Sequence, residues 1–409
     1  MALSASPLFS PLATEDGPPT KRATSRLHLS SRGRMILLLS FVATSLGWFI
    51  LERTLLLQSI ISSPSETRFQ APPPQLLFQS SAPKMIDIIL LNTELDLLEI
   101  RLNELFYVVD NFVIIESNIT FSGHPKKLHY KENLQRFQKF RHKIHHIELP
   151  PMSEEEAKAH NDGWGNEHYT RNKGVEITIK ELQPQEGDWI LLSDLDEVPR
   201  PSILLAMKYP EPGSETASLF LDHPVSEGAL DLFRFGCRFY YYSYEYYKGT
   251  WMGPVVMRFR EHESHLQRIK LTGSESAELK TQKEFMATIG VNNGWTGLGS
   301  NMRGARFDEA ATVVDDACWH CSWCFSSVAQ VIEKSQSYSH SEHNQGDYQK
   351  KEWILDHYRR GEDLFGRASE VVTIIPTNFD IPDYIRYNRN KYSYMLERNG
   401  APNAGFTDV

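Results

Sequence analysis

The chain has 409 residues and a formal net charge of −9 at pH 7, with 41% hydrophobic and 11% aromatic residues. This composition excludes a disordered scaffold, which would contain far fewer tyrosine, phenylalanine and tryptophan residues. The excess of acidic residues argues against a nucleic-acid-binding protein, which would need a basic face.

The N-terminal region predicts a membrane anchor. An uncharged apolar run at residues 35–51 follows Arg32 and Arg34, so the positive-inside rule places the N-terminus in the cytoplasm and predicts a single-pass type II protein. A cleaved signal peptide is the alternative, although the 34 residues before the run are long for one. The predicted segments are a Ser/Pro-rich disordered tail at 1–34, the transmembrane anchor at 35–51, a Pro-rich stem at 52–84 and a folded luminal domain at 85–409.

From residue 85 onward, apolar runs of strand length alternate with apolar residues at helical spacing. Strands are predicted at residues 86–91, 110–116, 143–149 and 188–193, and helices at residues 95–106 and 169–182. This order predicts an α/β fold with a Rossmann-like, mostly parallel, doubly wound sheet. Ligands bind at the carboxyl ends of the strands in such sheets, where Asn92, Glu116 and Asp194 fall.

A densely aromatic segment, FRFGCRFYYYSYEYY, occupies residues 233–247. It predicts either strands of the core or an aromatic-lined groove. Six of the eight residues at 240–247 are tyrosines. Since this exceeds what strand alternation would bury, we expect some of these rings to face a sugar ligand.

The four cysteines allow two kinds of site. Cys318, Cys321 and Cys324 have the spacing C-x-x-C-x-x-C and could ligate zinc, with Cys237 or His320 as the fourth ligand. In a secretory lumen they could instead form disulfides, and the pair Cys321–Cys324 is the favoured possibility.

The motif Asp194-Leu195-Asp196-Glu197 directly follows the apolar residues 189–192. Two carboxylates separated by one residue at a strand end can converge on a hard cation such as Mn²⁺ or Mg²⁺. Such an ion would bridge the diphosphate of a sugar nucleotide and neutralise charge as the nucleotide leaves. Haloacid-dehalogenase phosphohydrolases share the pattern, with Asp194 as nucleophile and residues 315–316 as a later acidic pair, but their motif normally lies on the first core strand.

Five segments together resemble glycosyltransferase family 17. They are residues 92–105, Glu116-Ser117-Asn118, Asp162-Gly163-Trp164, residues 194–199 and the highly specific string Trp319-His320-Cys321-Ser322-Trp323-Cys324-Phe325. The resemblance covers roughly residues 85–365. It implies an A-type glycosyltransferase fold, UDP-GlcNAc as donor, inversion at the anomeric carbon, and β-1,4 transfer to a mannose of a glycoprotein N-glycan in the Golgi.

The resemblance also implies roles for individual residues. Asp194 and Asp196 would hold the metal, and His320 is either a third ligand or a packed core histidine. Arg171 would contact the donor or form a helix-surface salt bridge, and Lys334 would face phosphate or lie on a solvated helix end. The expected donor contacts are Asn92, Glu94, Glu116, Asn118, Arg171, Asp194 and Lys334.

An inverting transfer needs a general base to accept the proton of the acceptor hydroxyl. The candidates, none of which the sequence singles out, are Glu197, Glu245, Asp316 and Glu342. Asn118-Ile119-Thr120 is the one N-x-[ST] sequon, and we expect it to be unmodified because it follows a strand end where the donor should lie. A catalytically silent glycan-binding protein is the remaining alternative.

Overall fold

The computed structural model describes residues 82–150, 152, 163–220, 231–259, 297–307, 311–344, 346–367 and 371–409. The predicted tail and anchor, and nearly all of the predicted stem, lie outside the described residues. Within these ranges no helix has both the length and the apolar character needed to cross a membrane.

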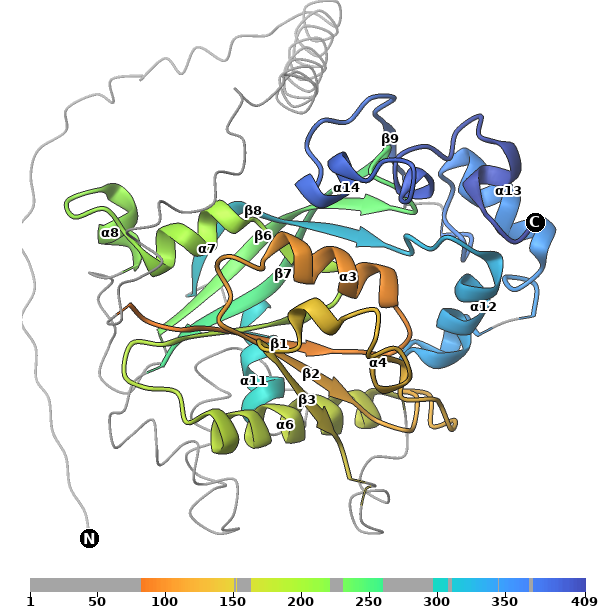
Figure 1. Cartoon of the computed structure of the whole chain (residues 1–409). Helices are drawn as coiled ribbons and strands as arrows, with labels where there is room; N and C mark the ends of the chain where they lie inside the picture. The colour runs from red at the N-terminus through yellow and green to blue at the C-terminus, as the bar shows by residue number, and fades with distance from the viewer. Residues whose placement is uncertain are drawn as a thin grey trace, which may run out of the picture. The chain divides into compact units, whose positions relative to one another are not determined.

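The described residues form one sheet of nine strands (Figure 1). Its first half contains the four strands that the sequence predicts, which pair in parallel in the order β3-β2-β1-β4. These strands are β1 (Met85–Leu90), β2 (Asn111–Glu116), β3 (Ile144–Glu148) and β4 (Trp189–Asp194). Their carboxyl ends therefore share one edge, and Asp194 lies at that edge.

The second half of the sheet is mixed, so the prediction of a mostly parallel sheet is correct only for the first half. β7 pairs antiparallel with both β4 and β6, β6 pairs in parallel with β8, and β5 pairs antiparallel with β8. The bounds are β5 (Glu197–Pro199), β6 (Asp231–Tyr241), β7 (Tyr246–Arg258), β8 (Thr312–Ser322) and β9 (Thr373–Ile374), which pairs with β7. The aromatic segment folds into the hairpin β6–β7 because antiparallel neighbours need only a short turn, whereas parallel ones need a long crossover.

Helices cover both faces of the parallel half. α6 (Gly163–Leu182) and α11 (Leu298–Gly304) lie on one face, and α3 (Leu95–Glu104) and α7 (Pro201–Lys208) lie on the other (Figure 1). α6 approaches the sheet closely at Gly174, where an added Cβ would lie 2.1 Å from Ile115 Cδ1.

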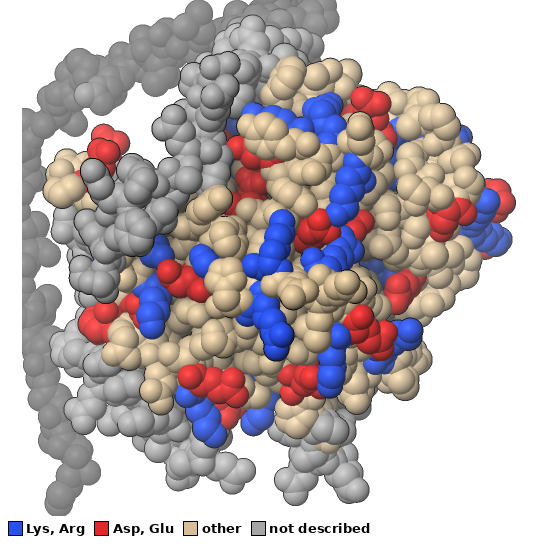
Figure 2. Space-filling model, in the orientation of Figure 1, with Lys and Arg blue, Asp and Glu red and all other residues tan. Residues whose placement is uncertain are grey.

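Smaller elements complete the described chain. The further helices are α4 (His129–Glu132), α8 (Glu215–Phe220), α12 (Val328–Ser337), α13 (Lys351–Arg360) and α14 (Asp383–Tyr387). The 3₁₀ helices are η1 (Gln138–Phe140), η3 (Ala305–Phe307), η4 (Ser341–His343), η5 (Ser393–Met395) and η6 (Pro402–Gly405). On the face shown in Figure 2, acidic and basic side chains are interspersed, and no large patch of one sign is seen among the described residues.

The tyrosines of the aromatic segment belong to the core, and the prediction that some face a ligand is wrong. All six between residues 240 and 247 are at most 8% exposed. Tyr242 stacks on Tyr358 of α13 with ring centroids 3.8 Å apart, and the Tyr246 hydroxyl donates to the Arg359 carbonyl at 2.7 Å. C-terminal elements thus cover rings that strand alternation alone would leave exposed.

All four cysteines form disulfides. Cys237 of β6 is bonded to Cys318 of β8, where the two residues are register partners, and Cys321 is bonded to Cys324. No cysteine is left as a thiolate, so the zinc alternative for these residues is wrong.

Candidate active site

A buried ion pair between α3 and β1 fixes the turn that follows β4. Arg101 of α3 pairs with Asp87 of β1 at 2.7 Å, and both side chains are fully buried. The same guanidinium donates to the backbone carbonyls of Asp194 at 3.2 Å and Glu197 at 2.7 Å, and to Ser193 Oγ at 2.6 Å. Arg101 therefore sets the path of the chain through the acidic motif.

Glu197 is a buried anchor of this turn. Its carboxylate accepts hydrogen bonds from Arg303 Nη1 at 2.9 Å and Nη2 at 2.7 Å, and from Trp251 Nε1 at 2.7 Å. The side chain is 0% exposed, and an added Cβ on Gly253 would lie 3.0 Å from its Cδ. Glu197 consequently has no free oxygen facing a ligand, and its proposed role as the general base is wrong.

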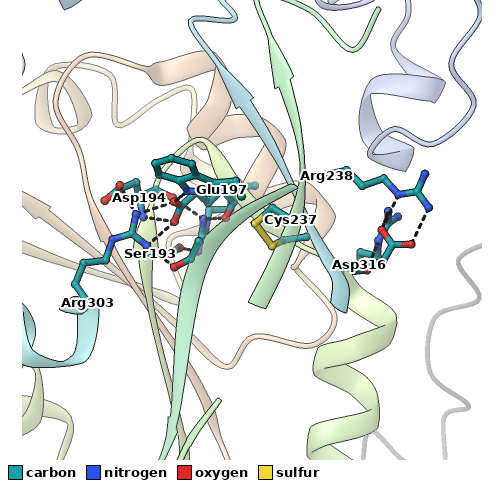
Figure 3. The surroundings of a disulfide bond; sticks show 12 residues. Ser193, Asp194, Glu197, Cys237, Arg238, Arg303 and Asp316 are labelled. Atoms are coloured by element: carbon teal, nitrogen blue, oxygen red, sulfur yellow. Dashed lines mark hydrogen bonds and ion pairs between the residues drawn. A yellow bond between two sulfur atoms is a disulfide. The ribbon is translucent and has the colours of Figure 1, made fainter. Parts of the chain in front are cut away.

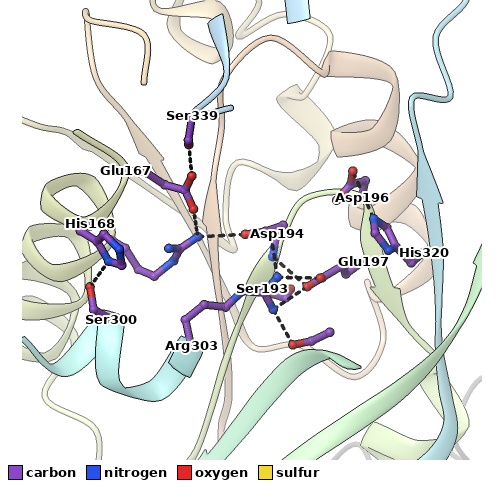
Figure 4. Close-up of polar contacts among 12 residues, drawn as sticks. Glu167, His168, Ser193, Asp194, Asp196, Glu197, Ser300, Arg303, His320 and Ser339 are labelled. Carbon is purple, nitrogen blue, oxygen red and sulfur yellow. Dashed lines mark hydrogen bonds and ion pairs between the residues drawn. The ribbon is translucent and has the colours of Figure 1, made fainter. Parts of the chain in front are cut away.

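Asp194 lies between two arginines (Figure 4). Its carboxylate accepts from Arg303 of α11 at 2.6 Å and from Arg171 of α6 at 3.0 Å. Burial raises the pKa of Asp194, but the positive charges of Arg303 and Arg171 outweigh it and hold the pKa well below its usual range. Asp194 is therefore ionised, and a metal ion would have to compete with two guanidinium groups for it.

Arg171 forms salt bridges, but its side chain is 4% exposed, so they are buried and reach the site instead of lying on the helix surface. Besides Asp194, it donates to Glu167 one helical turn earlier, at 2.7 Å. Glu167 in turn accepts a hydrogen bond from Ser339, in the segment that follows α12 (Figure 4). A continuous chain of polar contacts thus runs from Ser339 to Asp194.

Asp196 pairs with His320 on the other side of the turn. His320 Nε2 lies 3.5 Å from Asp196 Oδ2, and the His320 ring stacks on Phe239 with centroids 4.6 Å apart and an interplanar angle of 9°. Burial raises the pKa of Asp196, but the neighbouring His320 and Lys334 lower it overall. His320 lies within β8, two residues before the strand ends at Ser322.

This geometry tests whether the predicted ligands fit a metal ion. The Asp196 and His320 ligand atoms are close enough to occupy two positions around one divalent cation. His320 Nδ1 is buried, and no described residue forms a hydrogen bond with that nitrogen. Asp194 does not form a set of three ligands with Asp196 and His320. Among the described residues, one set of three potential ligand atoms lies within 4.8 Å of one another, and it does not include these residues.

α12 closes the site above the end of β1. Lys334 forms an ion pair with Glu94, and Asn92 Nδ2 donates to Ser337 Oγ at 2.7 Å. Burial lowers the pKa of Lys334, but Glu94 and Asp196 more than offset it and raise the pKa above its usual range. Asn92 Oδ1 is buried and has no hydrogen-bond partner among the described residues. The structure therefore brings Asn92, Glu94 and Lys334 to the same edge as Asp196.

Two of the predicted donor contacts, Glu116 and Asn118, do not lie with the residues around Asp196. Glu116 is fully buried and accepts from His146 Nε2 at 2.8 Å and from the Tyr130 backbone N–H at 2.9 Å, so it anchors α4 instead of facing a ligand. Asn118 is exposed on the loop after β2, where its sequon can be reached from solvent.

The remaining candidates for the general base lie outside this cluster. Asp316 pairs with Arg200 at 2.6 Å and Arg238 at 2.8 Å, beyond the Cys237–Cys318 disulfide from Asp194 (Figure 3). Glu245 is buried and accepts from the Arg398 backbone N–H at 2.8 Å. Glu342 lies in η4, beside His340. The predicted catalytic role is therefore wrong for the buried Glu245. It stays a prediction for Asp316, whose side chain is 48% exposed, and Glu342 belongs to a separate cluster.

Sequence reasoning missed Arg101, Arg303 and Trp251. A signal existed for Arg101, because it lies at helical spacing from Leu98 and Leu105, on the apolar face of α3. Asp87, the one charged residue within an otherwise apolar strand, was its matching signal. The sequence contains no such signal for Arg303, since it follows a long segment without a recognisable motif.

The chain was compared with known proteins. Residues 77–273 and 296–401 match the family model described as Glycosyltransferase family 17. The chain is 26% identical over 329 residues to a beta-1,4-mannosyl-glycoprotein 4-beta-N-acetylglucosaminyltransferase of Mus musculus, and 26% identical over 333 residues to proteins of that name from Rattus norvegicus and Homo sapiens.

These alignments cover 77% of this chain and 54 to 55% of the relatives, so the chain spans about half the length of the curated relatives it matches. A solved structure, the inositol-1-phosphate CTP transferase from T. maritima, is similar with a TM-score of 0.30 and 10% identity. That similarity covers 65% of this chain and 98% of the solved one, and it is too low to assign a fold.

Proposed function

Because this chain belongs to glycosyltransferase family 17, we propose that it transfers N-acetylglucosamine from UDP-GlcNAc to a mannose of a protein-linked N-glycan. The transfer inverts the anomeric carbon and forms a β-1,4 linkage, on a fold of the A-type glycosyltransferase class. The observation that carries the proposal is the convergence of Asp194, Asp196, His320 and Lys334 at the carboxyl edge of the parallel strands. Open α/β sheets bind nucleotides at this edge.

The charges of the site suit a nucleoside diphosphate. Lys334 is 22% exposed and carries a positive charge beside Asp196, so it can exchange part of its contact with Glu94 for a phosphate oxygen. Asn92 Oδ1 is buried without a partner among the described residues, and it would accept a hydrogen bond from the uracil or ribose when the donor displaces the side chains that cover it. Arg171 and Arg303 act indirectly, because their contact with Asp194 fixes the turn that carries Asp196.

A divalent cation, Mn²⁺ or Mg²⁺, completes the proposed site. Asp196 and His320 would hold it, and Asp194, which is paired with two arginines, would not. When bound, the ion neutralises negative charge on the departing diphosphate. The chain itself contributes the orientation of the ligands: the stack of Phe239 on His320 fixes the imidazole, and the buried Arg303 fixes the turn.

Two alternative functions remain to be compared with this proposal, a phosphohydrolase and a silent glycan-binding protein. Family membership decides against a haloacid-dehalogenase phosphohydrolase. The two ion pairs of Asp194 also oppose it, because they leave its carboxylate unavailable as a nucleophile. A silent glycan-binding protein is distinguished by titration with UDP, which it would not bind.

The disulfides and the N-terminal apolar run support a proposed location in the secretory pathway. The two disulfides favour an oxidising compartment, and the apolar run at residues 35–51 is proposed to anchor the protein in the Golgi membrane with its folded part in the lumen. Protease protection of the folded part in intact microsomes would support this topology, and its digestion there would contradict it.

Product analysis tests the proposal. The purified full-length chain is incubated with Mn²⁺, an N-glycan with exposed mannose, and either UDP-GlcNAc, UDP-glucose or UDP-galactose. We expect mass spectrometry to show one added N-acetylhexosamine with UDP-GlcNAc alone, on mannose. Transfer of a hexose instead, or hydrolysis of UDP-GlcNAc without transfer to any mannose, would contradict the proposed donor or acceptor.

A further inference from the structure

Three side chains of the segment between α12 and α13 converge on one point. His340 Nδ1 lies 2.6 Å from Glu342 Oε1, and His343 Nε2 lies 3.9 Å from the same oxygen. One ligand atom from each of the three residues lies within 4.8 Å of the other two. The donor site uses none of these atoms.

Packing fixes the two imidazole rings. His343 stacks on Phe365, with centroids 4.3 Å apart and an interplanar angle of 13°. His340 lies edge-on to Trp164 of α6 at 4.7 Å and stacks near His343 at 5.7 Å. Rings that neighbouring side chains already hold lose less conformational freedom when they ligate an ion.

We propose that His340, Glu342 and His343 form a Zn²⁺ site. Two imidazole nitrogens and one carboxylate oxygen are a ligand set typical of zinc, whereas Mn²⁺ and Mg²⁺ prefer oxygen. Ligand atoms around tetrahedral zinc are roughly 3.4 Å apart, given metal–ligand distances of about 2.1 Å. The present separations, up to 4.8 Å, require side-chain shifts of about 1 Å. Water completes the fourth position.

The site lies one residue from a contact of the donor site. Ser339, which precedes His340, donates a hydrogen bond to Glu167, and Glu167 accepts from Arg171. A zinc ion bound at the next residues holds Ser339 against α6 and so restrains the polar chain that ends at Asp194 (Figure 4). The zinc proposal concerns a site separate from the donor site and does not depend on the identity of the donor.

Zinc titration tests this inference. The purified full-length chain is treated with EDTA, exchanged into metal-free buffer and titrated with Zn²⁺ in competition with a chromophoric chelator. We expect one tightly bound equivalent and at least tenfold weaker binding after either His340→Ala or His343→Ala. Binding should be unchanged after His142→Ala, a change at an exposed histidine that precedes β3.

Two further measurements separate the zinc site from the donor site and from misfolding. His320→Ala removes the candidate ligand of the donor site, so the tight zinc equivalent should survive it. Zn²⁺ should raise the thermal unfolding midpoint of the wild type and leave that of the His340→Ala/His343→Ala variant unchanged. The inference is overturned if the tight equivalent persists in the double variant, if His320→Ala abolishes it, or if the wild type binds zinc no better than the double variant.

Discussion

Replacing Arg303 by methionine should destabilise the protein strongly, because Arg303 neutralises a carboxylate that has no access to water. Its guanidinium donates to Glu197 at 2.7 and 2.9 Å and to Asp194 at 2.6 Å, and the Glu197 side chain is 0% exposed. Without Arg303, Trp251 is the one side-chain donor to Glu197 within the part of the chain that the structure describes. Breaking a buried ion pair by removing one partner costs about 3–5 kcal/mol, so we expect a loss of that size in the free energy of unfolding.

The double variant Arg303→Met/Glu197→Gln separates the stranded charge from lost packing. The glutamine side-chain oxygen still accepts from Trp251, and position 197 no longer carries a buried charge, while the 42% exposed Asp194 keeps Arg171. We expect the double variant to be about 2 kcal/mol more stable than Arg303→Met alone. Urea unfolding under non-reducing conditions, followed by tryptophan fluorescence, gives these values. A loss below about 1 kcal/mol for Arg303→Met, or a double variant no more stable than the single one, would refute the reasoning.

Two other changes test the electrostatics and the covalent links. Burial raises the pKa of Glu104 from 4.5 to about 7, so its contribution to stability is fully present below pH 4.5 and is lost as the pH rises through 7. That loss amounts to about 3 kcal/mol. Glu104→Gln should therefore flatten the decline in the free energy of unfolding that is measured between pH 5 and 8. An unchanged slope would contradict the raised pKa of Glu104. Removing the Cys237–Cys318 disulfide, which spans 81 residues, should cost about 3 kcal/mol more than removing Cys321–Cys324, which spans 3. Equal costs in denaturant unfolding of the two double-serine variants would contradict this.

Local patterns predicted the parallel half of the sheet because three of its four strands, β1, β2 and β4, are apolar runs that the sequence shows directly. The same patterns placed Asp194 and Asp196 at a strand end, since the residues before them are buried on both faces. They did not predict the partner of Glu197, because Arg303 lies 106 residues away along the chain. A motif specifies residue types and spacing, and it leaves open which carboxylate a distant arginine will neutralise.

The prediction that tyrosines of the aromatic segment face a ligand was wrong for a related reason. Counting tyrosines showed that one sheet face could not bury them all, but the rings at residues 241, 242 and 246 pack against Tyr358, Phe365 and other residues more than 100 positions later. The sequence contains no local signal that α13 and the C-terminal segments lie over the hairpin. Asp316 illustrates the opposite case: it is close to His320 in the sequence, yet its side chain pairs with Arg200 and Arg238 on the far side of a disulfide.

Binding of UDP-GlcNAc by matched aspartate variants tests the proposed donor site most directly. Isothermal titration calorimetry in the presence of Mn²⁺ compares the wild type with Asp196→Asn and Asp316→Asn, which remove one carboxylate charge each. We predict that Asp196→Asn weakens donor binding at least tenfold and that Asp316→Asn leaves it unchanged. Wild-type affinity in Asp196→Asn, or a loss confined to Asp316→Asn, would contradict the placement of the donor beside Asp196 and His320.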